Sequence, residues 1–536
     1  MKFLCLSVLL ALGTIALALD GQFGIHDPST VVQCEGKYYT WGTGGTPLVS
    51  DDGWTWRAGV RPPRTGAAPD VIHIGDKYFM YVVGGGAPNP DRLANKNSIV
   101  MLWSKTLNPD SPDYKWEDGG TGATSDGIED CNAIDPGAFL DPTTGRFWLT
   151  YGSYVGYIRL VELDPKTGRR KNPNDKPIDL AINCEASDMI YHDGWYYLLA
   201  THGSCCRGSE SGYNIRMGRS KKVTGPYVDA MDIDMIQGGG KMLIGSGGRV
   251  IGAGHFGLLD LGQGVQKFSL HWEADLDKGG GSVLDIRPLL WKDGWPVAGE
   301  NAKEGMYEIE SARTGTALEM AVEGVPVGGR RAGRGGGGRG PGAPGAPGGA
   351  PPDPGRGGQS AAAGASQASG RGGQGATAGA PQPSGRGGGG GGMFAGSGTP
   401  IPNQDVKEVS VNWPAGNIDA RMGIYLCQAQ QKWIIAPAPN AGGYPGSPYF
   451  KITVAGTDRA LAATEDGELI VLPAFTGGPE QLWRLDQLAD GSFRIMPKAI
   501  PNSKELLALS AVGYSSATLA KFDPSSDKQH WLLKTP

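Results

Sequence analysis

Five ionisable side chains recur at similar places in the first 300 residues of the chain: Asp27, Asp70, Asp135, Glu185 and His255. Each stands ahead of a turn rich in Gly or Asp, which is followed by a run of aromatic and β-branched residues. That order is typical of a β-hairpin. If these side chains met in one place, they could perform general acid/base chemistry. Hydrolysis of a glycosidic bond needs such a set, since one carboxyl protonates the leaving oxygen and another acts across the sugar ring.

The elements that would bring these side chains together are five hairpin units of similar design. Their aromatic runs are residues 38–41, 78–81, 147–151, 195–199 and 268–272. A repeat of roughly 40–70 residues built from strands and Gly turns is typical of a β-propeller blade. The first strand of every blade lines the central axis, so residues at matching positions converge there. The sequence therefore predicts an all-β fold, with a five-bladed β-propeller over residues 20–300. The alternative is that the five side chains are ordinary turn and cap residues.

The length and charge of the chain set further limits. At 536 residues it is too long for one hydrophobic core, and we expect two or three domains. Residues 1–18 have the form of a signal peptide, and no later apolar segment is long enough to span a bilayer. We therefore expect a secreted or periplasmic protein with no membrane partner, and a monomer. Without Lys2 the formal charge is −6, from 48 basic and 54 acidic residues. An acidic body argues against nucleic acid as a partner.

Six cysteines remain after the expected cleavage: Cys34, Cys131, Cys184, Cys205, Cys206 and Cys427. Disulfides are possible in an exported chain, but the sequence does not choose among fifteen pairings. Cys131 and Cys184 are interpreted either as small buried residues or as one bridge. No Cys spacing indicates a zinc site. A serine-nucleophile elbow, a phosphate-binding loop and a zinc-protease motif are also missing from the sequence.

The C-terminal part, residues 301–536, has a different organisation. Its segment 328–396 is rich in Gly, Ala, Pro and Arg, has almost nothing to bury, and is predicted to be a disordered insert. The remainder contains Q-x-W three times, at 431–433, 481–483 and 529–531. This pattern resembles the ricin-type β-trefoil, a sugar-binding module. The family's usual sugar-binding Asp corresponds here to Glu319, to Ala462 and to Ala508, so the resemblance implies a degenerate trefoil.

Residues 24–300 resemble glycoside hydrolase family 43, and within it the endo-α-1,5-L-arabinanases. The matching motifs, in the family's order, are H-D-P-S at 26–29, A-P-D-V at 68–71, N-A-I-D-P at 132–136, C-C-R-G at 205–208 through Tyr213, G-R-S-K at 218–221, T-G-P-Y at 224–227 and G-H at 254–255. The resemblance implies an inverting mechanism on an arabinan-type polysaccharide or oligosaccharide. It assigns Asp27 as general base, Glu185 as general acid, and Asp135 as the residue that raises the pKa of the acid.

The same resemblance implies a substrate site and an ion site. We expect the substrate to contact His26, Asp70, Asn132, Arg207 and Tyr213. We expect His255 to face an axial metal ion, usually Ca²⁺, held largely through water.

The residues around the two principal carboxyls agree with this assignment. Glu185 lies in an apolar strand, and both an apolar setting and a nearby carboxylate raise a carboxyl pKa. Asp27 has His26 and Ser29 beside it and can remain ionised as a base.

Two departures from the family pattern, C-E-A-S at 184–187 and S-G-Y at 211–213, bear on which sugar fits. The alternatives are therefore an α-L-arabinofuranosidase or β-xylosidase on the same scaffold, or a non-catalytic carbohydrate-binding protein.

Overall fold

The computed structural model describes residues 19–45, 47–84, 97–125, 132–262, 264–322, 413–501 and 504–536. The predicted signal peptide (1–18), the predicted insert (328–396) and Cys131 lie outside the described residues. Strands dominate the described part of the chain, and its helices are all 3₁₀ helices of three residues. None of these helices is long and apolar enough to cross a membrane. The prediction of an all-β fold is confirmed.

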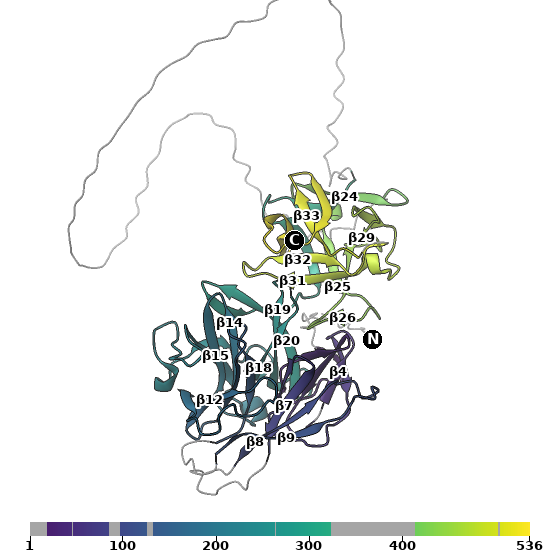
Figure 1. Ribbon diagram of the computed structural model, residues 1–536. Coiled ribbons are helices and arrows are strands. Elements are labelled where there is room, and N and C mark those ends of the chain that lie inside the picture. Colours follow the sequence, from purple (N-terminus) through teal and green to yellow (C-terminus); the bar gives the residue numbers. More distant parts are fainter. Residues whose placement is uncertain are drawn as a thin grey trace, which may run out of the picture. The chain divides into compact units, whose positions relative to one another are not determined.

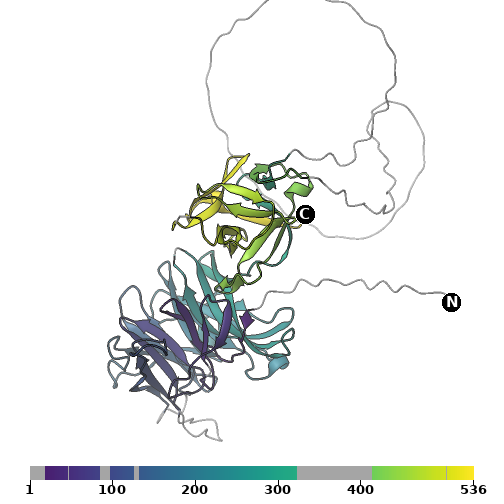
Figure 2. The same ribbon diagram turned by 90° about the vertical axis from the view of Figure 1, so that its right-hand side faces the viewer.

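Five sheets form the five blades of a β-propeller, whose strands run from purple to teal in Figures 1 and 2. Blade 1 contains β1 (Asp20–Gly21), β2 (Val32–Cys34), β3 (Lys37–Trp41), β4 (Pro47–Ser50) and β5 (Thr55–Ala58). Blade 2 contains β6 (Asp70–Ile74), β7 (Lys77–Val83), β8 (Ser98–Ser104) and β9 (Glu117–Thr124). Blade 3 contains β10 (Gly137–Leu140), β11 (Phe147–Tyr151), β12 (Tyr157–Leu163) and β13 (Ile178–Ile182).

The last two blades follow the same order. Blade 4 contains β14 (Glu185–His192), β15 (Trp195–His202), β16 (Asn214–Ser220) and β17 (Lys241–Ile244). Blade 5 contains β18 (Val250–Asp260), β19 (Gln266–Asp275), β20 (Gly281–Lys292) and β21 (Trp295–Ala298). Neighbouring strands within each blade are antiparallel, apart from the parallel pair β1–β5. Each predicted aromatic run lies in the strand that pairs with the innermost strand of its blade, which is β3, β7, β11, β15 or β19, and below these are called the second strands.

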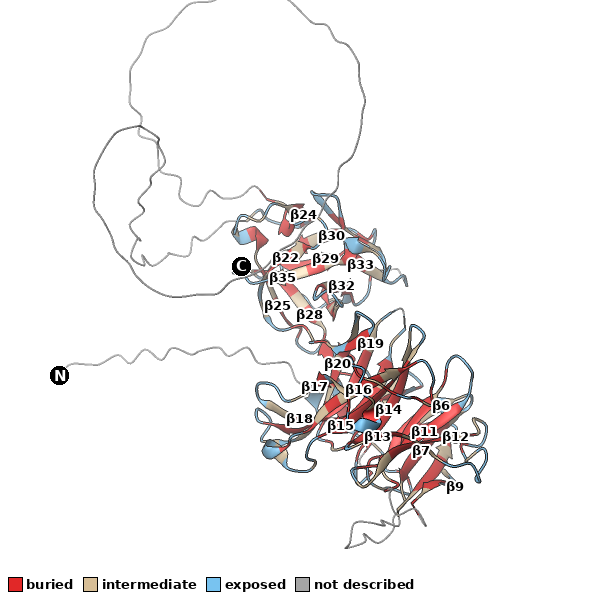
Figure 3. Cartoon of the chain, turned by 90° about the vertical axis from the view of Figure 1, so that its left-hand side faces the viewer, coloured by how far each residue is buried: buried red, intermediate tan, exposed pale blue. Residues whose placement is uncertain are grey.

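The hydrophobic core lies between the blades rather than at one centre, and Figure 3 shows buried residues in the labelled strands of blades 2 to 5. One cluster joins blades 1 and 2, a second joins blades 2 and 3, and a third joins blades 3 and 4. A fourth cluster joins blades 4, 5 and 1 and so closes the ring. The segment before β2 adds to this closure, since Leu284 N donates to Phe23 O at 2.9 Å. Because flat blades bury both faces against neighbours, the axis is left for polar side chains.

The C-terminal part repeats one local structure three times. In each unit the Gln of Q-x-W ends a 3₁₀ helix and the Trp begins a strand. The pairs are η3 (Ala429–Gln431) with β25 (Trp433–Pro437), η4 (Pro479–Gln481) with β31 (Trp483–Gln487), and η5 (Asp527–Gln529) with β35 (Trp531–Lys534). Other strands of this part include β22 (Gly305–Ser311), β23 (Ala317–Met320), β24 (Ile418–Gly423), β28 (Phe450–Val454), β29 (Ala460–Ala463), β30 (Leu469–Leu472), β32 (Phe493–Pro497), β33 (Leu507–Val512) and β34 (Ser516–Lys521).

The three tryptophans of these units are fully buried in one core and make equivalent hydrogen bonds. Their indole N–H groups donate to the carbonyls of Leu318, Leu461 and Leu509, at 2.8, 3.1 and 2.8 Å. The residues that follow these leucines are therefore equivalent, and they are Glu319, Ala462 and Ser510. The alignment of Ala508 with Glu319 is wrong by two residues, because L-A-L-S offers two leucines and the sequence does not say which one meets the indole.

Candidate active site

Each blade bends its chain sharply at one non-glycine residue near the axis. These residues have positive φ: 51° at Asp27, 39° at Ala68, 51° at Asp135, 51° at Ala186 and 49° at His255. Residues other than glycine rarely adopt this conformation, and it is often found at functional sites. The bends mark the equivalent position of the five blades, and three of the five side chains there are ionisable.

The expected register of the five ionisable side chains is therefore wrong in two blades. Glu185 lies one residue before the bend at Ala186, and Asp70 lies two residues after the bend at Ala68. In blade 4 the pairing of β14 with β15 shifts between Glu185 and Asp188. A bulge of this kind inserts residues that counting along the sequence does not reveal.

A cavity of about 680 Å³ lies at the axial ends of the blades. It is lined by all three predicted catalytic carboxyls, together with His26, Tyr213 and His255. Its wall also includes Thr43, Ile134, Cys205, Cys206 and Glu273. The cavity thus brings together six of the nine predicted site residues, from blades 1, 3, 4 and 5.

Asp27 is surrounded by hydrogen-bond donors. One of its oxygens, Oδ2, accepts from Thr43 Oγ1 at 2.6 Å and lies 2.8 Å from His26 Nδ1. The other, Oδ1, lies 2.9 Å from His255 Nε2. Burial by itself would raise the pKa of Asp27, but His255 and His26 outweigh it and hold that pKa well below its usual range. Asp27 is therefore ionised, as a general base must be.

Glu185 is held by two hydroxyl groups instead of cations. Tyr213 Oη donates to Oε1, and Ser153 Oγ donates to Oε2 at 2.9 Å. Burial raises the pKa of Glu185, and the negative charge of Asp27 adds to this effect. A carboxyl with a raised pKa keeps its proton nearer to neutral pH, which is what a general acid requires.

Asp135 is buried beside Glu185 in the cavity wall. Burial and the charge of Glu185 raise the pKa of Asp135 well above its usual range. Two neighbouring buried carboxyls do not readily ionise together, so the pair retains a proton under conditions where Asp27 has lost its own.

Three of the predicted substrate-binding residues do not line the cavity. Asp70 is buried, and its carboxylate accepts from Thr30 N at 3.1 Å and from Ala138 N at 2.8 Å. It therefore links β6 to the segment before β2 and to β10, in three blades. Asn132 is buried and accepts from Asn97 Nδ2 at 2.6 Å. Arg207 is exposed.

The structure adds three supporting residues that sequence reasoning missed. Thr43 and Ser153 each lie two residues after the second strand of their blade, so their shared position was a signal that could have identified them. Glu273 is buried in β19, with Oε1 located 3.3 Å from His26 Nε2. An acid within an aromatic strand, two residues after His271, was the available signal.

The described cysteines comprise one disulfide and three free thiols. Cys205 and Cys206, adjacent in the sequence, form a disulfide. Cys34, Cys184 and Cys427 are free thiols. Because Cys184 is free and buried, the interpretation as a small buried residue holds for it and the bridge to Cys131 is wrong.

The contacts of His255 bear on the expected ion site. Ca²⁺ takes six to eight oxygen ligands. The His255 imidazole is instead ion-paired with Asp27, and this partner raises the pKa of His255 although burial would lower it. A protonated imidazole repels a cation, so these contacts do not fit a Ca²⁺ ion bound directly to His255.

A five-bladed propeller that holds three carboxyls in one axial cavity is the arrangement expected of a carbohydrate-active hydrolase. The family model of glycosyl hydrolases family 43 matches residues 37–296. An extracellular exo-α-(1→5)-L-arabinofuranosidase of Cellvibrio japonicus is 34% identical over 266 residues, which cover 44% of this chain and 75% of the relative. The chain belongs to glycosyl hydrolases family 43, and it is a glycoside hydrolase.

Two further matches are a relative and a solved structure. An extracellular endo-α-(1→5)-L-arabinanase of Bacillus subtilis is 29% identical over 301 residues, covering 51% of this chain and 87% of the relative. The crystal structure of an exo-1,5-α-L-arabinanase from a bovine ruminal metagenomic library is 33% identical, with a TM-score of 0.47. It covers 52% of this chain and 98% of that chain.

Proposed function

We propose that this chain hydrolyses α-1,5-linked L-arabinan by an inverting mechanism. The observation that carries the proposal is the opposite behaviour of two carboxyls in one cavity, because the pKa of Asp27 is lowered and that of Glu185 is raised. Asp27 removes a proton from the attacking water, and Glu185 protonates the leaving oxygen. Asp135, the buried carboxyl beside Glu185, makes it harder for both groups to ionise, so the two carboxyls together keep a proton. The substrate class is supported by the relatives, which are named as an exo-α-(1→5)-L-arabinofuranosidase and an endo-α-(1→5)-L-arabinanase.

His26 and Tyr213 stay in this proposal as residues that contact the sugar, since both line the cavity. Asp70, Asn132 and Arg207 do not line it, and we assign them no contact with the bound sugar. Tyr213 has a second role, because its hydroxyl donates to Glu185 and so orients the acid.

The experiment that tests the function is a product profile on linear 1,5-arabinan, with Asp27→Asn as the inactive control. A spread of oligomers indicates endo action. Release of arabinose alone indicates the exo-acting alternative, which the name of the Cellvibrio japonicus relative favours. Release of xylose from xylan with no action on arabinan would contradict the proposal. No hydrolysis of either polymer would favour a carbohydrate-binding protein.

The ion near His255 also stays a proposal, restricted to Ca²⁺ held through water molecules. No step of the mechanism depends on it. The test is exhaustive treatment with a chelator, followed by thermal unfolding with and without added Ca²⁺. A melting temperature that Ca²⁺ does not change would remove the ion from the proposal.

We propose that residues 301–536 form a degenerate ricin-like β-trefoil that binds sugar weakly or not at all. The three equivalent Gln–Trp units support the trefoil. Glu319, the best match to a sugar-binding acid, is already used within the protein. Its carboxylate accepts from Arg421 Nε at 2.7 Å and from Gln431 Nε2 at 2.8 Å. We also propose that the protein is exported and acts as a monomer; a secreted fraction that elutes at the monomer mass on size exclusion is expected.

A further inference from the structure

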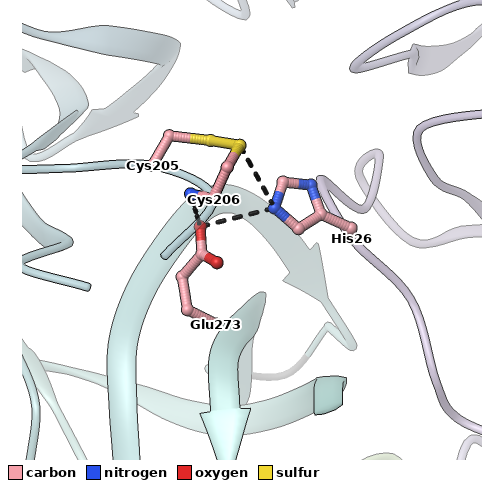
Figure 4. Close-up of side chains that lie close together, drawn as sticks. All are labelled: His26, Cys205, Cys206 and Glu273. Atoms are coloured by element: carbon pink, nitrogen blue, oxygen red, sulfur yellow. Dashed lines mark hydrogen bonds and ion pairs between the residues drawn. A yellow bond between two sulfur atoms is a disulfide. The ribbon is translucent and has the colours of Figure 1, made fainter. Parts of the chain in front are cut away.

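Glu273 is a buried acid in the wall of the cavity that the proposed mechanism does not use. Its residue is 3% exposed, and its carboxylate is turned toward His26 and the Cys205–Cys206 disulfide (Figure 4). Oε1 accepts from the backbone N–H of Cys206 at 2.9 Å and lies 3.3 Å from His26 Nε2. A buried carboxylate is costly unless it is paired and hydrogen-bonded, so these contacts hold Glu273 in one position.

His26 lies between two carboxylates. Its Nδ1 is 2.8 Å from Asp27 Oδ2, and its Nε2 faces Glu273 Oε1. Only the doubly protonated imidazole can donate to both partners. The contacts therefore form a chain of carboxylate, imidazolium and carboxylate that leads from Glu273 to Asp27.

The Cys205–Cys206 disulfide lies at the Glu273 end of this row of contacts. Cys206 Sγ lies 3.9 Å from His26 Nε2, and the Cys206 backbone has a φ of 63°. A bridge between adjacent residues closes a very small ring, so it restricts only the local backbone. The peptide N–H of Cys206 is thereby kept pointing at Glu273.

We propose that Glu273 is a positioning residue: it holds His26, and through His26 it fixes the carboxylate of Asp27 for attack by water. The Cys205–Cys206 disulfide supports Glu273 through the Cys206 N–H. This inference rests on the proposed function, in which Asp27 is the general base. A misplaced base lowers the rate of the chemical step, whereas a lost contact with bound sugar weakens binding.

The test is Glu273→Gln, assayed on an arabino-oligosaccharide and on an aryl α-L-arabinofuranoside. Gln keeps an oxygen for the Cys206 N–H and loses the charge that faces His26. We expect kcat to fall about 10- to 100-fold with KM changed less than about threefold. The fall should be the same on both substrates, since water must be activated whichever group leaves. General loosening of the cavity would also disturb Glu185 and would harm the oligosaccharide more.

Glu162→Gln is the matched control. Glu162, in β12, is ion-paired with Arg146 and Lys171 and does not line the cavity, so kcat should be unchanged in this variant. A raised KM with wild-type kcat in Glu273→Gln would mean that Glu273 serves sugar binding, directly or through His26, and does not position Asp27, and would overturn the proposal. So would wild-type values of both constants. If Asp27→Asn were also fully active, the proposed function itself would have failed.

A second variant tests the disulfide. Cys205→Ser/Cys206→Ser retains the Glu273 carboxylate, so a smaller fall in kcat is expected than in Glu273→Gln, again equal on both substrates. Wild-type kcat in this double variant would overturn the role assigned to the disulfide.

Discussion

The pKa values of Asp27 and Glu185 shift in opposite directions because different groups surround the two carboxyls. Two imidazoles face Asp27, and cations at such distances favour the ionised form of a carboxyl. Two hydroxyls face Glu185, and they give less compensation for the water lost on burial. A carboxyl that ionises easily and one that keeps its proton therefore lie in the same cavity.

Glu185→Gln tests the role of the acid. We expect activity on arabinan, whose sugar leaving group is poor, to fall about 100- to 10,000-fold, because a positioned general acid contributes about that factor. Activity on an activated aryl arabinofuranoside should fall much less, since that leaving group departs without a proton. Both substrates are measured with the same enzyme preparation. Equal losses on the two substrates would argue against Glu185 as the acid.

At the scale of the strand, two further carboxyls form a layer below the bends. Asp70 and Asp188 each lie two residues after the bend of their blade, and the bends at Ala68 and Ala186 have positive φ. Asp188 is buried. Burial and the charge of Asp70 raise its pKa well above the usual range.

Asp188→Asn should change how stability depends on pH. A raised carboxyl pKa means that the folded state holds a proton which the unfolded state releases, so stability is lost as pH rises through the folded-state pKa. Asn resembles the protonated form and removes this loss. We expect the same melting temperature as wild type near pH 4, and one about 2–4 °C higher at pH 8, which corresponds to about 1 kcal/mol in a domain of this size.

Asp70→Asn is the contrasting variant. Asp70 accepts two backbone N–H groups, and an amide cannot accept both in the same geometry. This variant should be less stable at every pH. If Asp188→Asn were also less stable at every pH, the inference that Asp188 is protonated in the folded protein would be contradicted.

The strands of the propeller could be predicted from the sequence, but their register could not. Aromatic runs such as 195–199 give a local signal, and they lie in the second strands as expected. The bulges in β14 and β18 give no such signal, because they depend on how the inner strand pairs with its neighbour. Asp27, Asp135 and Glu185 were predicted as site residues from the family motifs. Thr43, Ser153 and Glu273 lie outside those motifs, and only their positions relative to the second strands could have indicated them.

At the scale of the whole molecule, the ring of blades gathers side chains that are more than 200 residues apart. His26 and Glu273 lie on either side of the closure between blades 1 and 5. Closing a long loop costs little more than closing a short one, since the entropy grows with the logarithm of length. Because His26 and Glu273 come from the two ends of the propeller, their contact, and with it the positioning of Asp27, forms only when the ring is closed.

Removal of residues 328–396, with a short linker in their place, should leave both activity and melting temperature nearly unchanged. The segment contains almost no core-forming residues, and it has seven arginines but a single acid, Asp353. Differential scanning calorimetry of the two chains makes the comparison. A fall of more than about 5 °C, on the order of 1 kcal/mol or more, would show that the segment packs against the rest of the protein.

The central claim is that Asp27 activates water on one face of the sugar while Glu185 protonates the leaving oxygen on the other. The most direct measurement is proton NMR of the first-formed reducing sugar, recorded before mutarotation. The proposed mechanism predicts that an α-linked arabinan substrate yields the β-anomer first. If the α-anomer appeared first, or a glycosyl-enzyme could be trapped, the reaction would run through a nucleophilic carboxylate and a covalent intermediate, and direct attack by water would be contradicted.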